Sequence, residues 1–306
     1  MRSTFIQTLT ELAEKDPRIV FMTSDLGFTV VERFQERFPD RFFNVGICEE
    51  NMVGMATGLA EAGYLPFVYS ITPFGVMRPY EFLKNGPSKQ DLPIRVIGIG
   101  SGFDYGINGF SHYALEDIAL IRTLEKFHVV APCDNAQATN ALRATWNSSS
   151  SIYYRLSKDD IHLATSEFDG NFRLDDCHHL YEGDDLLVIA IGSAVKLAED
   201  AILSLRGHGH SAGLLAVSTL DSAHDSILKV IQGYRSIITV EDHKVTGGLG
   251  SFICETIAES GTAVGIKRFG ASMDSNHQIG SRDFMRQLNG YSSSDLVKNA
   301  LRILEH

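Results

Sequence analysis

The chain has 306 residues, 44% of them hydrophobic and 21% charged, which is typical of a folded globular protein with more than one domain. Its formal net charge of −11 argues against a general nucleic-acid-binding or anionic-membrane surface. No apolar run is long enough to span a bilayer, and four scattered cysteines predict reduced thiols in a cytoplasmic protein without disulfides or a zinc site.

Apolar runs alternate with helical patterns through the first half, which predicts a parallel sheet wrapped by helices. The strands are predicted at residues 19–22, 42–45, 65–69, 94–99, 129–131 and 151–154. The helices are predicted at residues 5–15, 31–38, 49–62, 76–85, 115–124 and 135–146. In such sheets ligands bind in the loops that follow the strands, so these loops hold the candidate site residues.

Residues 158–183 are polar and interrupt this alternation, so we interpret them as a linker. A second alternating unit follows, with strands predicted at 186–191, 212–217, 236–240 and 263–268 and helices at 194–205, 250–259 and 293–304. The predicted fold class is therefore α/β, with two consecutive three-layer αβα units and mostly parallel sheets. The predicted domains are residues 1–157 and 184–306.

Acidic residues follow the first two predicted strands. Asp25 either forms a turn through its own backbone or faces a ligand in the loop after the first strand. The strand at 42–45 is expected to be buried, and Glu49 stands in the first turn of the next helix, where the helix dipole favours negative charge. On that helix Gly54 and Gly58 leave one side almost bare, which suits close packing against another backbone.

The loops after the third and fourth predicted strands carry aromatic and imidazole side chains. Phe74 precedes an Arg78-Pro79 step, and a core position is the alternative to a ligand contact for its ring. The glycine-rich loop 98–112 ends in Asn108-Gly109-Phe110-Ser111-His112. Its glycines would suit a phosphate cradle, but no lysine or Walker pattern completes one.

Two further motifs lie at the end of the first unit and in the second. Arg155 is either an exposed linker residue or an anion-binding residue, since a guanidinium matches phosphate geometry. Residues 241–250 contain Glu-Asp-His followed by Gly-Gly-Leu-Gly, which indicates a glycine-permitted helix start and a subunit contact. Three adjacent residues cannot all face one metal ion, and the spacing of a dinucleotide-binding loop is absent.

Together these motifs resemble the pyrimidine-binding and C-terminal domains of the transketolase family of thiamine diphosphate enzymes, over essentially all 306 residues. The resemblance implies that Glu49 bonds a ring nitrogen of the cofactor's aminopyrimidine, which gives it a catalytic role. It also implies that Phe74 stacks on that ring and that Asp25 lies near the cofactor. His112 would line the substrate channel as a catalytic residue, and Arg155 would grip the substrate's phosphate.

Two positions depart from the family's pattern. Asn108 stands where sugar transketolases carry an aspartate that recognises a donor hydroxyl, and it is expected to bind substrate without that charge. Gly100 stands where sugar transketolases carry a second histidine of the channel. The absence of that histidine side chain is expected to open space. An unusual donor or acceptor is therefore expected.

The family binds the cofactor's diphosphate through Mg²⁺ or Ca²⁺ with a Gly-Asp-Gly motif, which this sequence lacks. The resemblance therefore implies the β subunit of a split transketolase-like enzyme that transfers a two-carbon ketol unit. It would share thiamine diphosphate with an α subunit, which binds the metal ion, in an α2β2 heterotetramer. The alternatives are an acyloin-forming enzyme similar to deoxyxylulose-phosphate synthase, a 2-oxoacid dehydrogenase β subunit, and a non-catalytic partner that stabilises its α subunit.

Overall fold

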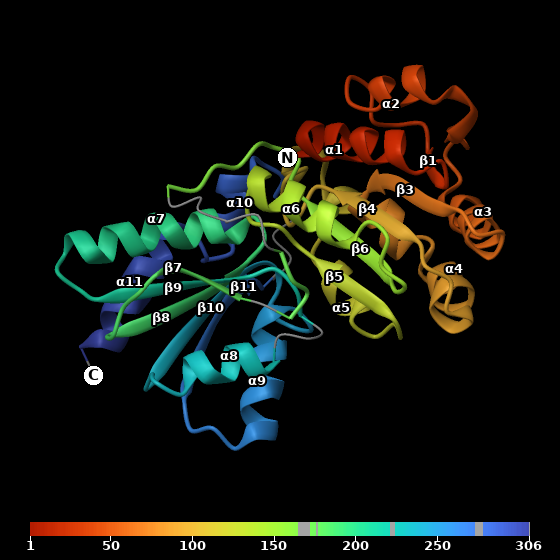
Figure 1. Cartoon of the computed structure of the whole chain (residues 1–306). Helices are drawn as coiled ribbons and strands as arrows, with labels where there is room; N and C mark the ends of the chain where they lie inside the picture. Colours follow the sequence, from red (N-terminus) through yellow and green to blue (C-terminus); the bar gives the residue numbers. More distant parts are fainter. Residues whose placement is uncertain (165–171, 176, 221–223, 273–277, 306) are drawn as a thin grey trace.

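The computed structural model describes residues 1–164, 172–175, 177–220, 224–272 and 278–305. The chain folds as two neighbouring α/β units, each built on one sheet, as Figure 1 shows. This arrangement confirms the predicted fold class. None of the helices within the described ranges is both long and apolar enough to cross a membrane.

The first sheet consists of six parallel strands in the order β2-β1-β3-β4-β6-β5. Its strands are β1 (Ile19–Thr23), β2 (Phe42–Asn44), β3 (Leu65–Ile71), β4 (Arg95–Ile99), β5 (Phe127–Val130) and β6 (Ser151–Leu156). The inner strands are rich in β-branched and aromatic residues and are buried along nearly their whole length. Such burial is expected where helices cover both faces of a parallel sheet.

The helices of the first unit bury one face each against this sheet. They are α1 (Arg2–Lys15), α2 (Glu32–Arg37), α3 (Glu49–Glu61), α4 (Tyr80–Leu83), α5 (Asp117–Ile121) and α6 (Asn135–Thr145). In α3, Met52, Val53 and Ala56 belong to the same buried cluster as residues of β1 and β3. The other side of α3 is exposed at Gly54 and Gly58, as the sequence pattern indicates.

The second sheet has five strands in the order β11-β10-β8-β9-β7, with β7 antiparallel to β9. Its strands are β7 (Cys177–Tyr181), β8 (Leu186–Ile191), β9 (Ala212–Val217), β10 (Ser236–Lys244) and β11 (Gly265–Ala271). Its helices are α7 (Ala194–Gly207), α8 (His224–Ile231), α9 (Leu249–Ser260), α10 (Arg282–Leu288) and α11 (Ser293–Leu304). The strand order changes direction between β8 and β10, the usual place for a ligand crevice in such sheets.

Two elements of the first unit differ from their predictions. β2 is not buried: it has a neighbour on one side only, and both Phe43 and Asn44 are exposed. The predicted helix at 76–85 is replaced by α4 between two π-helical turns, Pro73–Met77 and Lys84–Ser88. Pro79 and Pro87 have no backbone N–H to donate, which prevents one regular helix over this segment.

The predicted linker also differs from the structure. Its residues 177–181 form β7, so this part of the segment belongs to the second sheet, whereas 165–171 and 176 lie outside the described residues. The short helices α8 and α10 were not predicted. The division of the chain at residue 157 stays a prediction.

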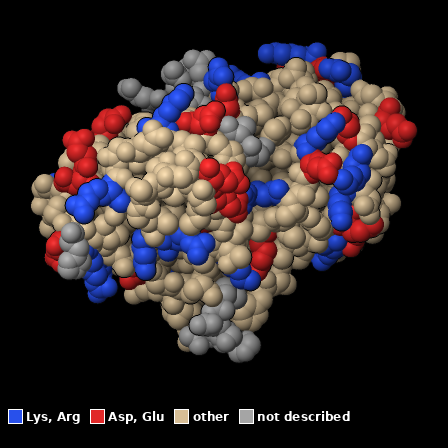
Figure 2. Space-filling view, turned by 90° about the horizontal axis from the view of Figure 1, so that it is seen from below, with Lys and Arg blue, Asp and Glu red and all other residues tan. Residues whose placement is uncertain are grey.

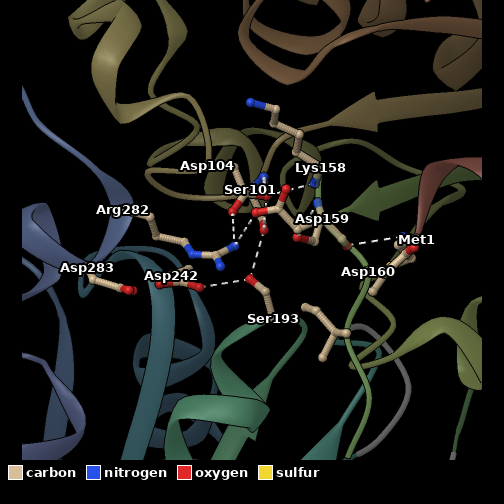
Figure 3. A network of polar contacts seen from close by, with 12 residues as sticks. Met1, Ser101, Asp104, Lys158, Asp159, Asp160, Ser193, Asp242, Arg282 and Asp283 are labelled. Atoms are coloured by element: carbon tan, nitrogen blue, oxygen red, sulfur yellow. Dashed lines mark hydrogen bonds and ion pairs between the residues drawn. The ribbon is translucent and has the colours of Figure 1, made fainter. Parts of the chain in front are cut away.

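The crevice between β8 and β10 is filled by the first unit (Figure 3). Ser193, which follows β8, hydrogen-bonds Ser101 of the first unit over 2.8 Å and donates to Asp242 of β10 over 2.7 Å. Asp104 of the first unit accepts a hydrogen bond of 2.7 Å from Arg282 of α10. These contacts fix the glycine-rich loop 98–112 between the two units.

Candidate functional site

The buried carboxylate of Glu49 is the centre of the candidate site. Glu49 begins α3 and is only 1% exposed, at the edge of the first sheet where its strands end. Arg78 Nη1 lies 2.6 Å from its Oε2, and Ser70 Oγ, at the end of β3, donates to its Oε1 over 3.4 Å. The helix N-terminus adds further positive potential, so a cation, a hydroxyl and a dipole all orient this carboxylate.

Phe74 and His112 form a row of rings beside the Arg78 guanidinium. The guanidinium lies 4.6 Å from the centroid of the Phe74 ring, whose edge-to-face contact with His112 has a centroid separation of 5.1 Å. Ser111 Oγ lies 3.0 Å from His112 Nδ1, which leaves Nε2 for another partner. Phe74, Arg78 and Ser111 border a pocket of about 360 Å³ that Phe110 also lines. The π-helical turn after β3 places Phe74 there.

Asp25 and Asn108 lie in loops at the same edge of the sheet, without a contact to Glu49. Asp25 is exposed and adopts a φ of 54°, a left-handed conformation that Asp tolerates better than most residues. Its carboxylate accepts a hydrogen bond of 3.0 Å from the side chain of Asn44. Asn108 is exposed at the end of a 3₁₀ turn, Gly106–Asn108.

Arg155 does not join this group, and its expected phosphate role does not fit its position. The side chain is buried, with Nε 2.6 Å from Asp117 Oδ2 and Nη2 donating to the carbonyls of Ala114 and Asp242. Burial alone would raise the pKa of Asp117, but the adjacent guanidinium outweighs it and lowers that pKa. Arg155 therefore ties the first unit to β10.

Both units of the chain match models of known protein domains. Residues 1–162 match the model of the transketolase pyrimidine-binding domain, and residues 175–292 match that of the transketolase C-terminal domain. The chain belongs to the transketolase family. This confirms the resemblance drawn from the sequence, and membership of the family implies dependence on thiamine diphosphate.

Relatives of this transketolase-family chain are similar over most of its length. It is 31% identical to the 6-deoxy-6-sulfo-D-fructose transketolase subunit SqwH of Clostridium sp. strain MSTE9, covering 100% of this chain and 94% of the relative. It is 33% identical to an apulose-4-phosphate transketolase subunit of Phocaeicola vulgatus, covering 87% and 86% respectively. A split-gene transketolase solved as an inactive β4 tetramer superposes with a TM-score of 0.87 and 26% identity, over 99% of this chain and 97% of that one.

The residues around Glu49 fit the pyrimidine half of thiamine diphosphate. The buried carboxylate of Glu49 and the Phe74 ring, which both contact Arg78, provide one hydrogen-bonding group and one stacking surface for a flat heterocycle. Arg78, the charged partner of Glu49, is 38% exposed and has room to move as a ligand enters. Within the described part of the chain, no three His, Cys, Asp or Glu residues are grouped to hold a metal ion.

The space expected at Gly100 is filled. Gly100 has a φ of 87°, and a Cβ at this position would lie 2.4 Å from the ring of Tyr105. The Tyr105 ring, whose centroid is 6.1 Å from that of His112, therefore occupies the side where a residue larger than glycine would project. The missing histidine of this transketolase-family chain is replaced by an aromatic side chain and not by a void.

Sequence reasoning gave no role to Arg78, Ser70 or Tyr105, which all border the site in the structure. The Arg78-Pro79 step is the sequence signal at Arg78. It does not point to Glu49, which lies 29 positions earlier in the sequence. No local pattern identifies Ser70 or Tyr105, because their contacts join segments that are distant in the sequence.

Proposed function

We propose that this chain is the β subunit of a split, thiamine diphosphate-dependent transketolase-like enzyme. The enzyme transfers a two-carbon ketol unit from a ketose or ketose phosphate donor to an aldehyde acceptor. The observation that carries this proposal is the carboxylate of Glu49, buried at the start of α3 and paired with Arg78, whose guanidinium also lies over the Phe74 ring. An acidic first turn that served only as a solvated cap would have no reason to bury its carboxylate.

Each residue of the site has a role in this proposal. Thiamine diphosphate, when bound, supplies the electron sink for cleavage and formation of the carbon–carbon bond. Glu49 holds the proton at an aminopyrimidine nitrogen, Phe74 supports the ring, and Asp25 lies near the cofactor. His112 hydrogen-bonds substrate oxygens through Nε2, and Asn108 contacts a donor hydroxyl.

The diphosphate and its Mg²⁺ or Ca²⁺ are assigned to a separate α subunit, in an α2β2 assembly. The absence of a Gly-Asp-Gly motif supports this division. So do large apolar side chains on loops that follow strands of the first sheet: Phe28 and Ile47 are each 72% exposed, and Ile107 is 70% exposed. Exposed apolar residues around a site are typical of a surface that another chain covers.

The names of the relatives agree with this division. SqwH and the relative from Phocaeicola vulgatus are each named as one subunit of a transketolase, and the β4 tetramer is described as inactive. The substrate in the name of SqwH is a sulfonated ketose, which supports a donor other than the ordinary sugar phosphates.

Reconstitution tests the proposal. The purified chain, the α chain and their mixture are each assayed with thiamine diphosphate, Mg²⁺ and a panel of ketose donors and aldehydes. Turnover is expected only from the mixture. Turnover by this chain alone would refute the split site, and full turnover by the α chain alone would show that this chain only stabilises its partner.

A further inference from the structure

A second pocket lies at the opposite edge of the second sheet from the domain junction. Its volume is about 830 Å³, within the usual range for small-molecule sites. The turn before β9 contributes His210, the start of β10 contributes Arg235 and Ser236, and β11 contributes Lys267. The last turns of α11 close it, with Arg302 among their residues. We call this cavity the basic pocket.

The cations of the basic pocket outnumber its carboxylates. Within the described part of the chain, the side chains of Arg235, Lys267 and Arg302 make no hydrogen bond or ion pair. The one carboxylate in the lining, that of Asp185, already accepts a hydrogen bond of 2.7 Å from the backbone N–H of Ser211. This is notable in a chain with a net charge of −11.

Several exposed cations elsewhere on the described part of the molecule are paired with carboxylates, although others, such as Lys15 and Lys229, are not. Examples are Arg18 with Asp16, Lys89 with Glu125, Lys126 with Asp91, Arg143 with Glu11 and Lys196 with Asp200. Seen from below in Figure 2, several Lys and Arg side chains lie on the lower left, over the second unit. Three unpaired cations from separate elements around one cavity raise each other's electrostatic energy, a cost that an anionic ligand removes.

Ordinary structural roles account for these cations only one at a time. Arg302 lies in the last turn of α11, where the helix dipole favours a cation, and Lys267 lies on an edge strand, where Lys discourages strand pairing. Neither role explains why both border the same concave space as Arg235. Neither explains the Ser236 hydroxyl and the Asn299 amide in the lining, which provide neutral hydrogen-bonding groups.

We propose that the basic pocket binds a phosphate group of a small anionic metabolite. Two guanidinium groups match phosphate oxygens in a bidentate manner, Lys267 adds a point charge, and Ser236 and Asn299 contact the remaining polar atoms of the ligand. The concave shape favours a small molecule over an extended acidic chain segment. Strands β8 to β11 begin at this edge and end at the domain junction, and the basic pocket shares no lining residue with the pocket beside Phe74.

Calorimetric titration of the full chain with inorganic pyrophosphate, and separately with inorganic phosphate, tests this proposal at constant ionic strength. Saturable one-site binding is expected, tighter for pyrophosphate. The Arg235→Gln/Arg302→Gln double variant is expected to weaken binding about tenfold or more, the usual effect of losing charge-assisted hydrogen bonds. The matched control is Lys15→Gln/Lys229→Gln, which removes two exposed cations outside the pocket and is expected to bind as the unmodified chain does.

Three outcomes would overturn the proposal. Equal weakening in both double variants would indicate a general charge effect. Heats of the same size when sodium chloride replaces the probe at the same ionic strength would indicate an adventitious ion only. Saturable binding of a poly-glutamate peptide without binding of pyrophosphate would assign the pocket to an acidic protein segment. All altered side chains are exposed, so thermal unfolding is expected to show intact folds.

Discussion

At the scale of single residues, Arg78 and Ser70 orient the carboxylate of Glu49. Arg78 holds this carboxylate over 2.6 Å and also lies against the Phe74 ring, so one guanidinium connects the acid to the aromatic side of the pocket. We infer that Arg78 is a positioning residue, which orients Glu49 and gives way to the cofactor because it is half-exposed.

Glu49→Gln is expected to lower the turnover of the reconstituted enzyme about 100- to 10,000-fold, because a carboxamide cannot hold the transferred proton. The measurement is steady-state turnover with the α chain, together with thermal unfolding to verify the fold. Glu50→Gln is the matched control, since Glu50 shares the first turn of α3 but is only half-buried. Near-normal turnover of Glu49→Gln would show that Glu49 is misassigned.

We propose that the substrate preference depends on Asn108 and on Tyr105, which stands beside Gly100. Xylulose 5-phosphate with ribose 5-phosphate is expected to be a poor pair, because Asn108 brings no charge to a donor hydroxyl. Asn108→Asp is expected to raise kcat/KM for this pair about tenfold. The matched control is Asn147→Asp, which adds the same negative charge at an exposed position on the loop after α6. Efficient turnover of the standard pair by the unmodified enzyme would contradict the idea.

At the scale of elements, α9 receives its N-terminal cap from a neighbouring strand. Glu241 of β10 accepts hydrogen bonds from the backbone N–H groups of Leu249 and Gly250, over 2.8 and 2.9 Å. A Cβ on Gly248 would lie 1.8 Å from this carboxylate, so the close approach requires glycine. Burial raises the pKa of Glu241 to about 7, although the two N–H groups oppose the increase.

This raised pKa predicts a pH-dependent stability. The folded state binds the Glu241 proton more tightly than the unfolded chain does, so the stabilisation is fully present below pH 4.5 and is lost as pH rises through about 7. It amounts to roughly 3 kcal/mol. Buried His243 has a lowered pKa and acts in the opposite direction as pH falls below 6.5. The test is therefore the difference between the unmodified chain and Glu241→Gln.

The free energy of unfolding is measured by urea titration between pH 4.5 and 7.5. The unmodified chain is expected to gain stability relative to Glu241→Gln as the pH is lowered. Glu259→Gln, an exposed position on the same helix, is expected to give a curve parallel to that of the unmodified chain. Parallel curves for all three proteins would show that Glu241 does not titrate in this range. Asp117 and Asp242 have lowered pKa values and act only below about pH 3.8.

At the scale of the whole molecule, the two units are joined by direct bonds and not by the linker alone. Lys244 N donates to Leu115 O over 3.0 Å, and Ala131 N donates to Ser218 O over 2.8 Å. Arg155 adds a buried connection from β6 to the Asp242 carbonyl. Because these contacts are buried or backbone-to-backbone, we expect the two units to unfold in a single transition.

Arg155→Met is expected to lower the free energy of unfolding by about 3 to 5 kcal/mol, because it leaves the buried charge of Asp117 without its partner. The Asp117→Asn/Arg155→Met double variant is expected to recover part of this loss. Urea denaturation measures both. A contrary outcome would be that Arg155→Met keeps its stability but raises the KM for phosphorylated donors. That result would show that Arg155 binds the substrate's phosphate after all.

Sequence reasoning recovered the long apolar strands because burial on both faces leaves a continuous hydrophobic signal. It predicted one site with Glu49, Phe74 and His112 among its residues. In the structure Arg78 connects Glu49 to Phe74, whose ring contacts His112, and the roles of these residues stay predictions. It missed β7, α8 and α10, which are short and partly exposed. It also misjudged β2 and Arg155, because the edge of a sheet and an ion pair to a residue 38 positions away leave no local pattern.

The glycine-rich loop 98–112 also limits how a gene for this chain could be divided. Gly102 and Gly106 lie directly against the second unit, where a Cβ would come within 2.7 Å of Asp242 and 2.4 Å of the Gly280 carbonyl, and the same loop carries His112. Contacts with the second unit therefore hold this loop of the first unit in its conformation. A gene fission between residues 157 and 177 would place this loop and its contacts on separate chains. The first unit alone is therefore expected to lose the conformation of the loop that carries His112.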